Sequence, residues 1–155
     1  MSITSRDLEG VTACFSKAGL VEGTNANTIK IAAPNGAGVD FAIDGYMYHK
    51  ADTDNIAMTA LAVQADLTTC LYGVDIDADG AVSLVKGTEV VTTQLSGGQS
   101  VVHPPAAVAN KCRIGLMKIV LSGGTFTSGT TDLSGTGVTD TYYDLAGPLT
   151  RPRSS

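Results

Sequence analysis

The sequence lacks tryptophan, is poor in charged residues and contains no long apolar run. Charged residues make up 16% of its 155 residues, whereas an average soluble domain has about 25%. No apolar stretch approaches the roughly 18 residues that a membrane-spanning helix needs, so we expect no membrane contact. Three cysteines are too few for a disulfide scaffold, and the composition is not that of a disordered chain. The length then allows one globular domain.

The chain also lacks a basic patch. Its net charge is −5, and its basic residues are scattered, apart from Arg151 and Arg153 near the C-terminus. Because a nucleic-acid-binding surface needs a basic stripe to neutralise phosphates, we expect no nucleic-acid partner. The first residues do not form a basic region followed by an apolar stretch, so we expect no export signal and synthesis in the cytoplasm.

The cysteines are Cys14, Cys70 and Cys112, which are far apart in the sequence and form no CxxC pair. Their odd number argues against a closed set of disulfides. We predict reduced, partly buried thiols that serve as small apolar side chains rather than as nucleophiles.

Short alternating runs and abundant turn residues make up most of the chain. The strongest hairpin signal is the pair Asp44-Gly45 between two runs of period two. Residues 111–121 are apolar at both sets of alternate positions, which predicts a central strand covered on both faces. Further strand patterns cover residues 28–32, 52–66, 68–76, 81–86, 89–93, 125–127 and 138–145. The pattern predicts an all-β fold, either a β-sandwich or a jelly-roll-like barrel.

The first 27 residues differ from the rest. Leu8, Val11, Phe15 and Ala18 recur at helical spacing, which predicts a short helix over residues 5–18. We therefore divide the chain into an N-terminal arm or helix (1–27), a β-domain (28–146) and a flexible C-terminal tail (147–155).

One motif matches the first half of a calcium-binding loop. Asp75, Asp77 and Asp79 alternate and are followed by Gly80, as in D-x-D-x-D-G. The twelfth position is Lys86 instead of a bidentate glutamate, and the flanks are strand-like. We favour a hairpin turn with exposed carboxylates, with a weak cation site as the alternative.

No arrangement of side chains predicts catalysis. His49 and His103 are more than fifty residues apart, and neither is accompanied by a recognisable serine or cysteine nucleophile motif. The glycine-rich segments lack the lysine of a phosphate-binding loop. We therefore assign no catalytic, cofactor-binding or metal-binding residue, and expect a protein that is not an enzyme.

Five segments resemble, in order and spacing, those of small virion proteins of tailed bacteriophages. They are IDGYMYHKADTDNIAMTA (43–60), CLYGVDIDADG (70–80), VKGTEV (85–90), CRIG (112–115) and FTSGTTDL (126–133). One departure is the loop at 101–107, which reads VVHPPAA where the resemblance leads us to expect a Pro-Ala-Gly-like turn.

The resemblance implies a β-rich structural protein of the virion. The function that it implies is that of a head-decoration, or cement, protein, which binds the major capsid protein on the capsid exterior and stabilises the shell. It also implies a homotrimer. Because the apolar face of residues 1–27 has no obvious place in a β-core, we expect this segment to contact the capsid or a neighbouring subunit. The alternative is a head-fibre or tail-associated module that binds a receptor or a glycan.

Overall fold

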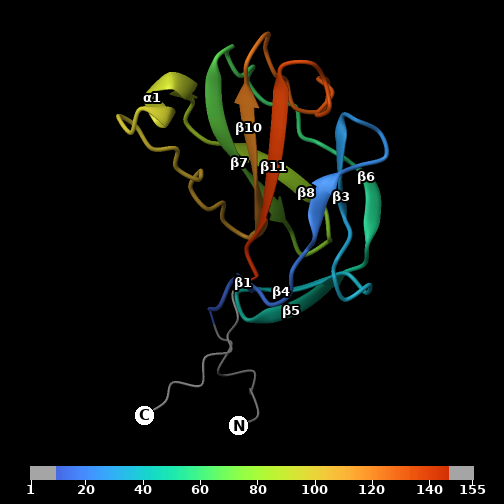
Figure 1. The fold of residues 1–155 in the computed structure, drawn as a ribbon. Helices are drawn as coiled ribbons and strands as arrows, with labels where there is room; N and C mark the ends of the chain where they lie inside the picture. Colours follow the sequence, from blue (N-terminus) through green and yellow to red (C-terminus); the bar gives the residue numbers. More distant parts are fainter. Residues whose placement is uncertain (1–9, 147–155) are drawn as a thin grey trace.

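The structure is a computed structural model that describes residues 10–146 (Figure 1). Its elements are β1 (Ala13–Cys14), β2 (Leu20–Glu22), β3 (Thr28–Ile31), β4 (Val39–Ile43), β5 (Tyr46–Lys50), β6 (Thr53–Ala57), β7 (Thr68–Ile76), β8 (Val82–Lys86), β9 (Val90–Val91), α1 (Thr92–Ser96), β10 (Cys112–Leu121) and β11 (Val138–Asp144). The predicted all-β class is confirmed, since α1 is the one helix within the described range.

The strands form three antiparallel sheets. The large sheet has the order β11-β10-β7-β8, and β9 continues the line of β8 along the same side of β7. The small sheets have the orders β1-β4-β5 and β2-β3-β6. Strands β1 and β4 contact β10, and β2 contacts β11. In Figure 1 the sheet with β1, β4 and β5 lies below the large sheet, and β3 and β6 lie beside it. Residues of all three sheets share one hydrophobic core. The architecture is therefore a sandwich with a divided second layer.

The core lies between these layers. Tyr72 of β7 meets Phe126 edge to face, with ring centroids 5.8 Å apart, a favoured aromatic geometry. The layers approach closely at Gly115 of β10, where an added Cβ would stand 2.2 Å from Cδ1 of Leu20 on β2. Glycine is therefore required there, because a side chain would push β2 away from the large sheet.

Strand β7 is buried along its whole length. Its core face packs against the small sheets, and its other face is covered by α1 and the loop that follows it (Figure 1). Thr92 of α1 shares a hydrogen bond of 3.0 Å between hydroxyls with Thr69 of β7. The irregular segment from 97 to 111 thus serves as the outer cover of the central strand.

Several predicted elements are confirmed. The Asp44-Gly45 turn joins β4 and β5 with φ of 49° and 84°, the positive values that this hairpin turn requires. The run at 111–121 is strand β10, which lies between β7 and β11. Only one face of β10 is fully buried, however, because its alternate side chains are half-exposed.

The predicted N-terminal helix is wrong over residues 10–18. This segment contains β1, which pairs with β4, and the side chains of Cys14 and Ala18 are buried in the core. Strand β2 pairs with β3 across the predicted boundary at residue 28. Helical spacing was misleading because long-range strand pairing overrides a local pattern that Gly10 already weakens. Residues 1–9, and the predicted tail at 147–155, lie outside the described residues.

Two weaker strand patterns are only partly realised. Within residues 52–66 only Thr53–Ala57 forms a strand, β6. Gln64 adds an isolated bridge to Phe126, and this bridge is the only strand pairing in the predicted strand at 125–127. Of the strand pattern at 89–93, only Val90–Val91 is a strand, and its last two residues begin α1. Isolated short runs of threonine and valine are too weak a signal to separate a strand from a single helical turn.

Candidate functional site

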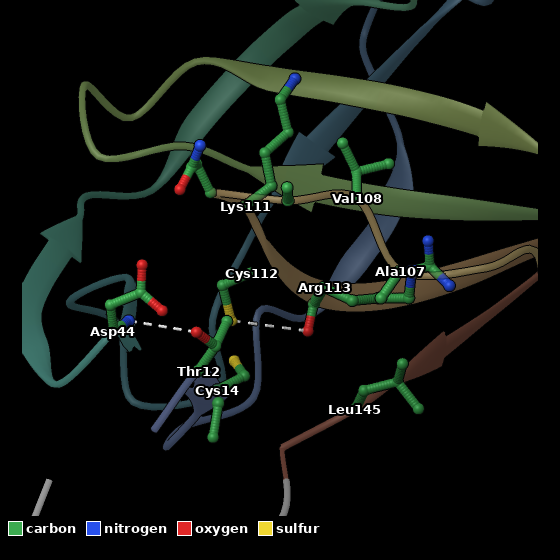
Figure 2. Close-up of a pocket in the computed structure, with 12 residues that line it drawn as sticks. Thr12, Cys14, Asp44, Ala107, Val108, Lys111, Cys112, Arg113 and Leu145 are labelled. Carbon is green, nitrogen blue, oxygen red and sulfur yellow. Dashed lines mark hydrogen bonds between the residues drawn. The ribbon is translucent and has the colours of Figure 1, made fainter. Parts of the chain in front are cut away.

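A pocket of about 840 Å³ has Thr12 and Leu145 among its lining residues (Figure 2). It therefore lies at the end of the body where the described chain begins and ends. Figure 1 shows the backbone at this end. The pocket is bounded by β1, by the β4–β5 turn and by the segment that leads into β10. Most of its lining is apolar and small, as in Ala13, Val108 and Leu145. Its size falls within the range of small-molecule pockets.

The β4–β5 turn forms one wall of this pocket, and the residues just before β1 hold it in place. The backbone N–H of Asp44 donates to Oγ1 of Thr12 at 3.1 Å, and that of Gly45 donates to the carbonyl of Val11 at 2.8 Å. These bonds fix the turn against the two residues that precede β1, in the segment whose spacing predicts a helix. We call Asp44, Gly45, Tyr46 and Met47 the hairpin tip.

The hairpin tip carries the most exposed aromatic side chain of the described body. Tyr46 is 72% exposed and its neighbour Met47 is 53% exposed. Two residues further on, Tyr48 turns inward and stacks on Phe41 with ring centroids 5.6 Å apart. The base of the hairpin is therefore rigid, whereas its tip presents two large side chains of the types enriched in protein interfaces.

Two of the cysteines, Cys14 and Cys112, line the pocket (Figure 2). Burial raises the pKa of the Cys14 thiol to about 11 and that of Cys112 to about 12. Cys70 lies elsewhere, in β7, and burial raises its pKa to about 11. All three thiols are free and buried, as the sequence predicted, and at neutral pH they stay protonated and unreactive.

These thiols predict a loss of stability in alkali. An unfolded thiol with a pKa near 9.0 loses its proton first, while the folded protein keeps it up to about pH 11. The folded state then binds more protons, so the free energy of unfolding falls as the pH rises from about 9 to about 11. We expect the free energy of unfolding to fall by at least about 3 kcal/mol from the three thiols together. Each thiol can contribute up to about 1.4 kcal/mol for each pH unit.

The measurement is the urea midpoint under reducing conditions at a series of pH values. Cys70→Ala should flatten the slope in this window, because it removes one of the three titrating groups. A midpoint that stays constant from pH 8 to pH 11 would contradict the prediction.

The calcium-loop motif is divided between two structural roles. Asp75 is 1% exposed, and Arg113 of β10 donates to both of its carboxylate oxygens, at 2.7 and 3.1 Å. Oδ1 of Asp77 accepts the backbone N–H groups of Asp79 and Ala81 at 3.0 and 2.9 Å. The interpretation of Asp75 as an exposed charge is therefore wrong, because a distant arginine neutralises it inside the protein.

The same arginine secures the loop that covers β7. Its guanidinium donates to the carbonyl of Pro105 and, at 3.0 Å, to that of Ala106. Gly73 leaves the space for it, since a Cβ at that position would lie 2.5 Å from Cζ of Arg113. Within residues 10–146, no group of three or more acidic, histidine or cysteine side chains is arranged to hold a metal ion.

The two histidines are on separate elements. Nδ1 of His49, on β5, lies 2.7 Å from Oδ1 of Asp40 on the neighbouring strand β4. His103 precedes Pro104 in the covering loop and lines a second groove beside β8. In the part of the chain that the structure describes, neither imidazole forms a hydrogen bond with a hydroxyl or a thiol.

Gln64 is a buried polar group that the sequence did not single out. It is fully buried, and its amide nitrogen donates to the carbonyls of Thr68 and Ile119 at 3.1 and 3.2 Å. Its amide oxygen accepts the hydroxyl of Tyr72 at 3.0 Å. The sequence gives no local signal for this network, because its members come from three segments.

Comparisons with protein-family models, with curated proteins and with solved structures give no match. The described part of the chain contains no helix with the length and apolar character needed to cross a membrane.

Proposed function

We propose that the protein is a structural component of a bacteriophage virion, a decoration protein that binds the exterior of the major capsid shell. The observation that carries the proposal is the hairpin tip. Tyr46 and Met47 stand exposed on a rigid hairpin at one end of the sandwich. Exposed tyrosine and methionine are costly in water unless a partner covers them, and they form strong anchors in interfaces.

The longest segment of the family resemblance, residues 43–60, includes the hairpin tip and supports a binding role for it. Within residues 43–60 only Ile43 and Met58 are buried, and the other side chains are exposed or half-buried. These exposed side chains contribute little to the hydrophobic core, so they can contact another protein. We infer that the capsid presents an apolar depression to the hairpin tip.

The sheets support self-association. Each small sheet ends in a strand with an open edge, β5 in one and β6 in the other, within the described body. Open edges are sites at which another strand can pair, and a closed homotrimer would cover some of them. A solution mass of about three times 15.8 kDa by light scattering is the expected result.

The decisive experiment is a binding assay on shells of the major capsid protein from the same phage. Wild-type protein should bind in hundreds of copies per particle. Tyr46→Ala combined with Met47→Ala should weaken binding at least about 30-fold, since an interface anchor contributes about 2 kcal/mol or more.

The matched control is Leu67→Ala. Leu67 is 58% exposed and precedes β7 at the end of the large sheet opposite the pocket. The Leu67→Ala variant should bind the shells as tightly as the wild-type protein does. Equal binding by the tip variant would refute the role of the hairpin tip. A few tens of copies per particle or fewer would instead favour a fibre or a tail-associated module.

A further inference from the structure

Strand β5 has an edge that no other strand within residues 10–146 occupies. It is the last strand of the sheet β1-β4-β5, and Figure 1 shows it at the outer margin of that sheet. Its five residues pair with β4 in an unbroken register from Tyr46 to Lys50. An edge of this kind exposes backbone donors and acceptors to which another strand can add.

The pairing of β4 with its neighbours shows which backbone groups of β5 face outward. The carbonyl of Asp40 accepts the backbone N–H of Phe15 at 2.8 Å, so the backbone of Asp40 faces β1 and not β5. Its cross-strand partner on β5 is His49. Hydrogen-bonded and open pairs alternate along an antiparallel ladder, so His49 and Met47 both belong to open pairs. Their N–H and C=O groups therefore point to the free edge.

The other long edges of the described body are protected against strand addition. In β6, Asn55 has a positive φ of 53° and the pairing with β3 shifts register, which bends this edge. Beside β8, Oγ1 of Thr59 accepts the backbone N–H of Leu84 at 3.1 Å, so another segment covers that edge. Strand β11 carries Asp140 and Asp144 and contacts β2. Bulges, covering segments and charges oppose strand addition, whereas β5 has an unbroken register and its one lysine is its last residue.

The free edge of β5 is continuous with the hairpin tip. Tyr46 and Met47 belong to both, and their side chains are 72% and 53% exposed. Nδ1 of His49 lies 2.7 Å from Oδ1 of Asp40 on β4, so this side chain leans away from the edge and leaves it clear. A strand that adds along β5 would therefore meet the Met47 side chain as its neighbour on the same face of the sheet.

We propose that an extended segment of the capsid protein adds to β5 as a further strand of the β1-β4-β5 sheet, a proposal that rests on the capsid-binding function above. The segment would bond to the outward N–H and C=O groups of Met47 and His49. In strand addition the backbone bonds give affinity and the flanking side chains give specificity. The partner segment is therefore free of proline at its pairing positions and carries an apolar side chain beside Met47.

A second copy of the chain is a poorer occupant of this edge. Two β5 strands that pair antiparallel are related by a two-fold axis, and this arrangement closes as a dimer. The expected oligomer is a trimer. The hairpin tip, which continues into the same edge, is already assigned to the capsid, so one partner can cover both.

Hydrogen exchange of single backbone amides tests the proposal on wild-type protein bound to shells of the major capsid protein. In the free protein the amides of Met47 and His49 should exchange fast, and that of Tyr48, which faces β4, should exchange slowly. Binding should slow Met47 and His49 about 10-fold or more and leave Tyr48 unchanged.

The outcomes of this experiment separate strand addition from capsid binding itself. Unchanged exchange of Met47 and His49 in a protein that binds the shells would overturn strand addition and leave the capsid-binding function standing. Absence of binding would overturn both. Slow exchange of the two amides in the free protein that becomes fast on dilution would assign the edge to a second copy and overturn the proposal.

A proline substitution tests the outward donor directly. His49→Pro removes the N–H from the free edge, a position at which an edge strand tolerates proline. We expect it to weaken shell binding at least about 5-fold, and His49→Ala, which keeps the donor, should bind several-fold more tightly than His49→Pro. Slow exchange of the Tyr48 amide in both free variants checks the pairing with β4. Equal binding by the two variants would overturn the proposal.

The matched control places proline on a different edge. The backbone N–H of Ser122 donates to the carbonyl of Gly137 at 2.9 Å, and β11 pairs with β10 in an unbroken register beyond that point. The alternation then leaves the N–H of Asp140 on the outward side of β11. Asp140→Pro should bind the shells within about 2-fold of wild type. A loss as large as that of His49→Pro would show that proline acts through the fold and would overturn the role of the β5 edge.

Discussion

Replacing Arg113 by methionine is expected to lower the free energy of unfolding by about 3–5 kcal/mol, because it leaves a buried carboxylate without its partner. Asp75 is 1% exposed and Arg113 donates to both of its oxygens. The variant also loses the bonds to Pro105 and Ala106. The loop that covers β7 should therefore loosen together with the ion pair.

Chemical denaturation followed by circular dichroism measures this effect. Lys118→Met removes another cation from β10, one that lies 6.0 Å from the ring centroid of Tyr143, and should cost less than about 1 kcal/mol. Adding Asp75→Val to Arg113→Met should recover much of the loss, since an apolar pair can replace a buried ion pair. An Arg113→Met protein as stable as wild type would show that Asp75 finds another partner.

Replacing Gln64 by leucine is expected to cost about 3 kcal/mol or more. Leucine fills the space, but it leaves the hydroxyl of Tyr72 without its acceptor and removes one donor each from the carbonyls of Thr68 and Ile119. Each buried polar group that loses its hydrogen bond costs about 1–3 kcal/mol. The exposed Gln94→Leu serves as the control, with an expected change within about 0.5 kcal/mol.

A double-mutant cycle separates the network from simple packing. Tyr72→Phe alone leaves the amide oxygen of Gln64 unpaired. Combined with Gln64→Leu, it removes both members of that bond, so the double variant should be more stable than the sum of the single losses implies. Additive losses would mean that the hydroxyl and the amide contribute independently.

Local sequence signals were sufficient where the structure depends on neighbouring residues. The Asp44-Gly45 turn needs two positive φ values, and few residue pairs adopt them, so the β4–β5 hairpin could be predicted. Strand β10 was predictable because ten consecutive residues carry a strong pattern. Both are short-range features.

The candidate site depends on contacts between distant residues, and local patterns do not report these. The N-terminal segment resembled a helix because nothing in it indicates that β4, nearly thirty residues later, offers an open edge for β1. Asp75 resembled a turn carboxylate because its partner Arg113 lies 38 residues away. The pocket joins the two ends of the described chain, which no local window contains.

The position of β7 at the centre of the large sheet also sets the order of assembly. Its hairpin with β8 closes over a short turn and can form as soon as both strands exist. Its other edge must wait for β10, whose first residue follows the last residue of β8 by 26 positions. During synthesis the apolar strand β7 therefore emerges with one edge unpaired. We expect docking of β10 to limit the folding rate, and crowding of nascent chains to favour aggregation before that step.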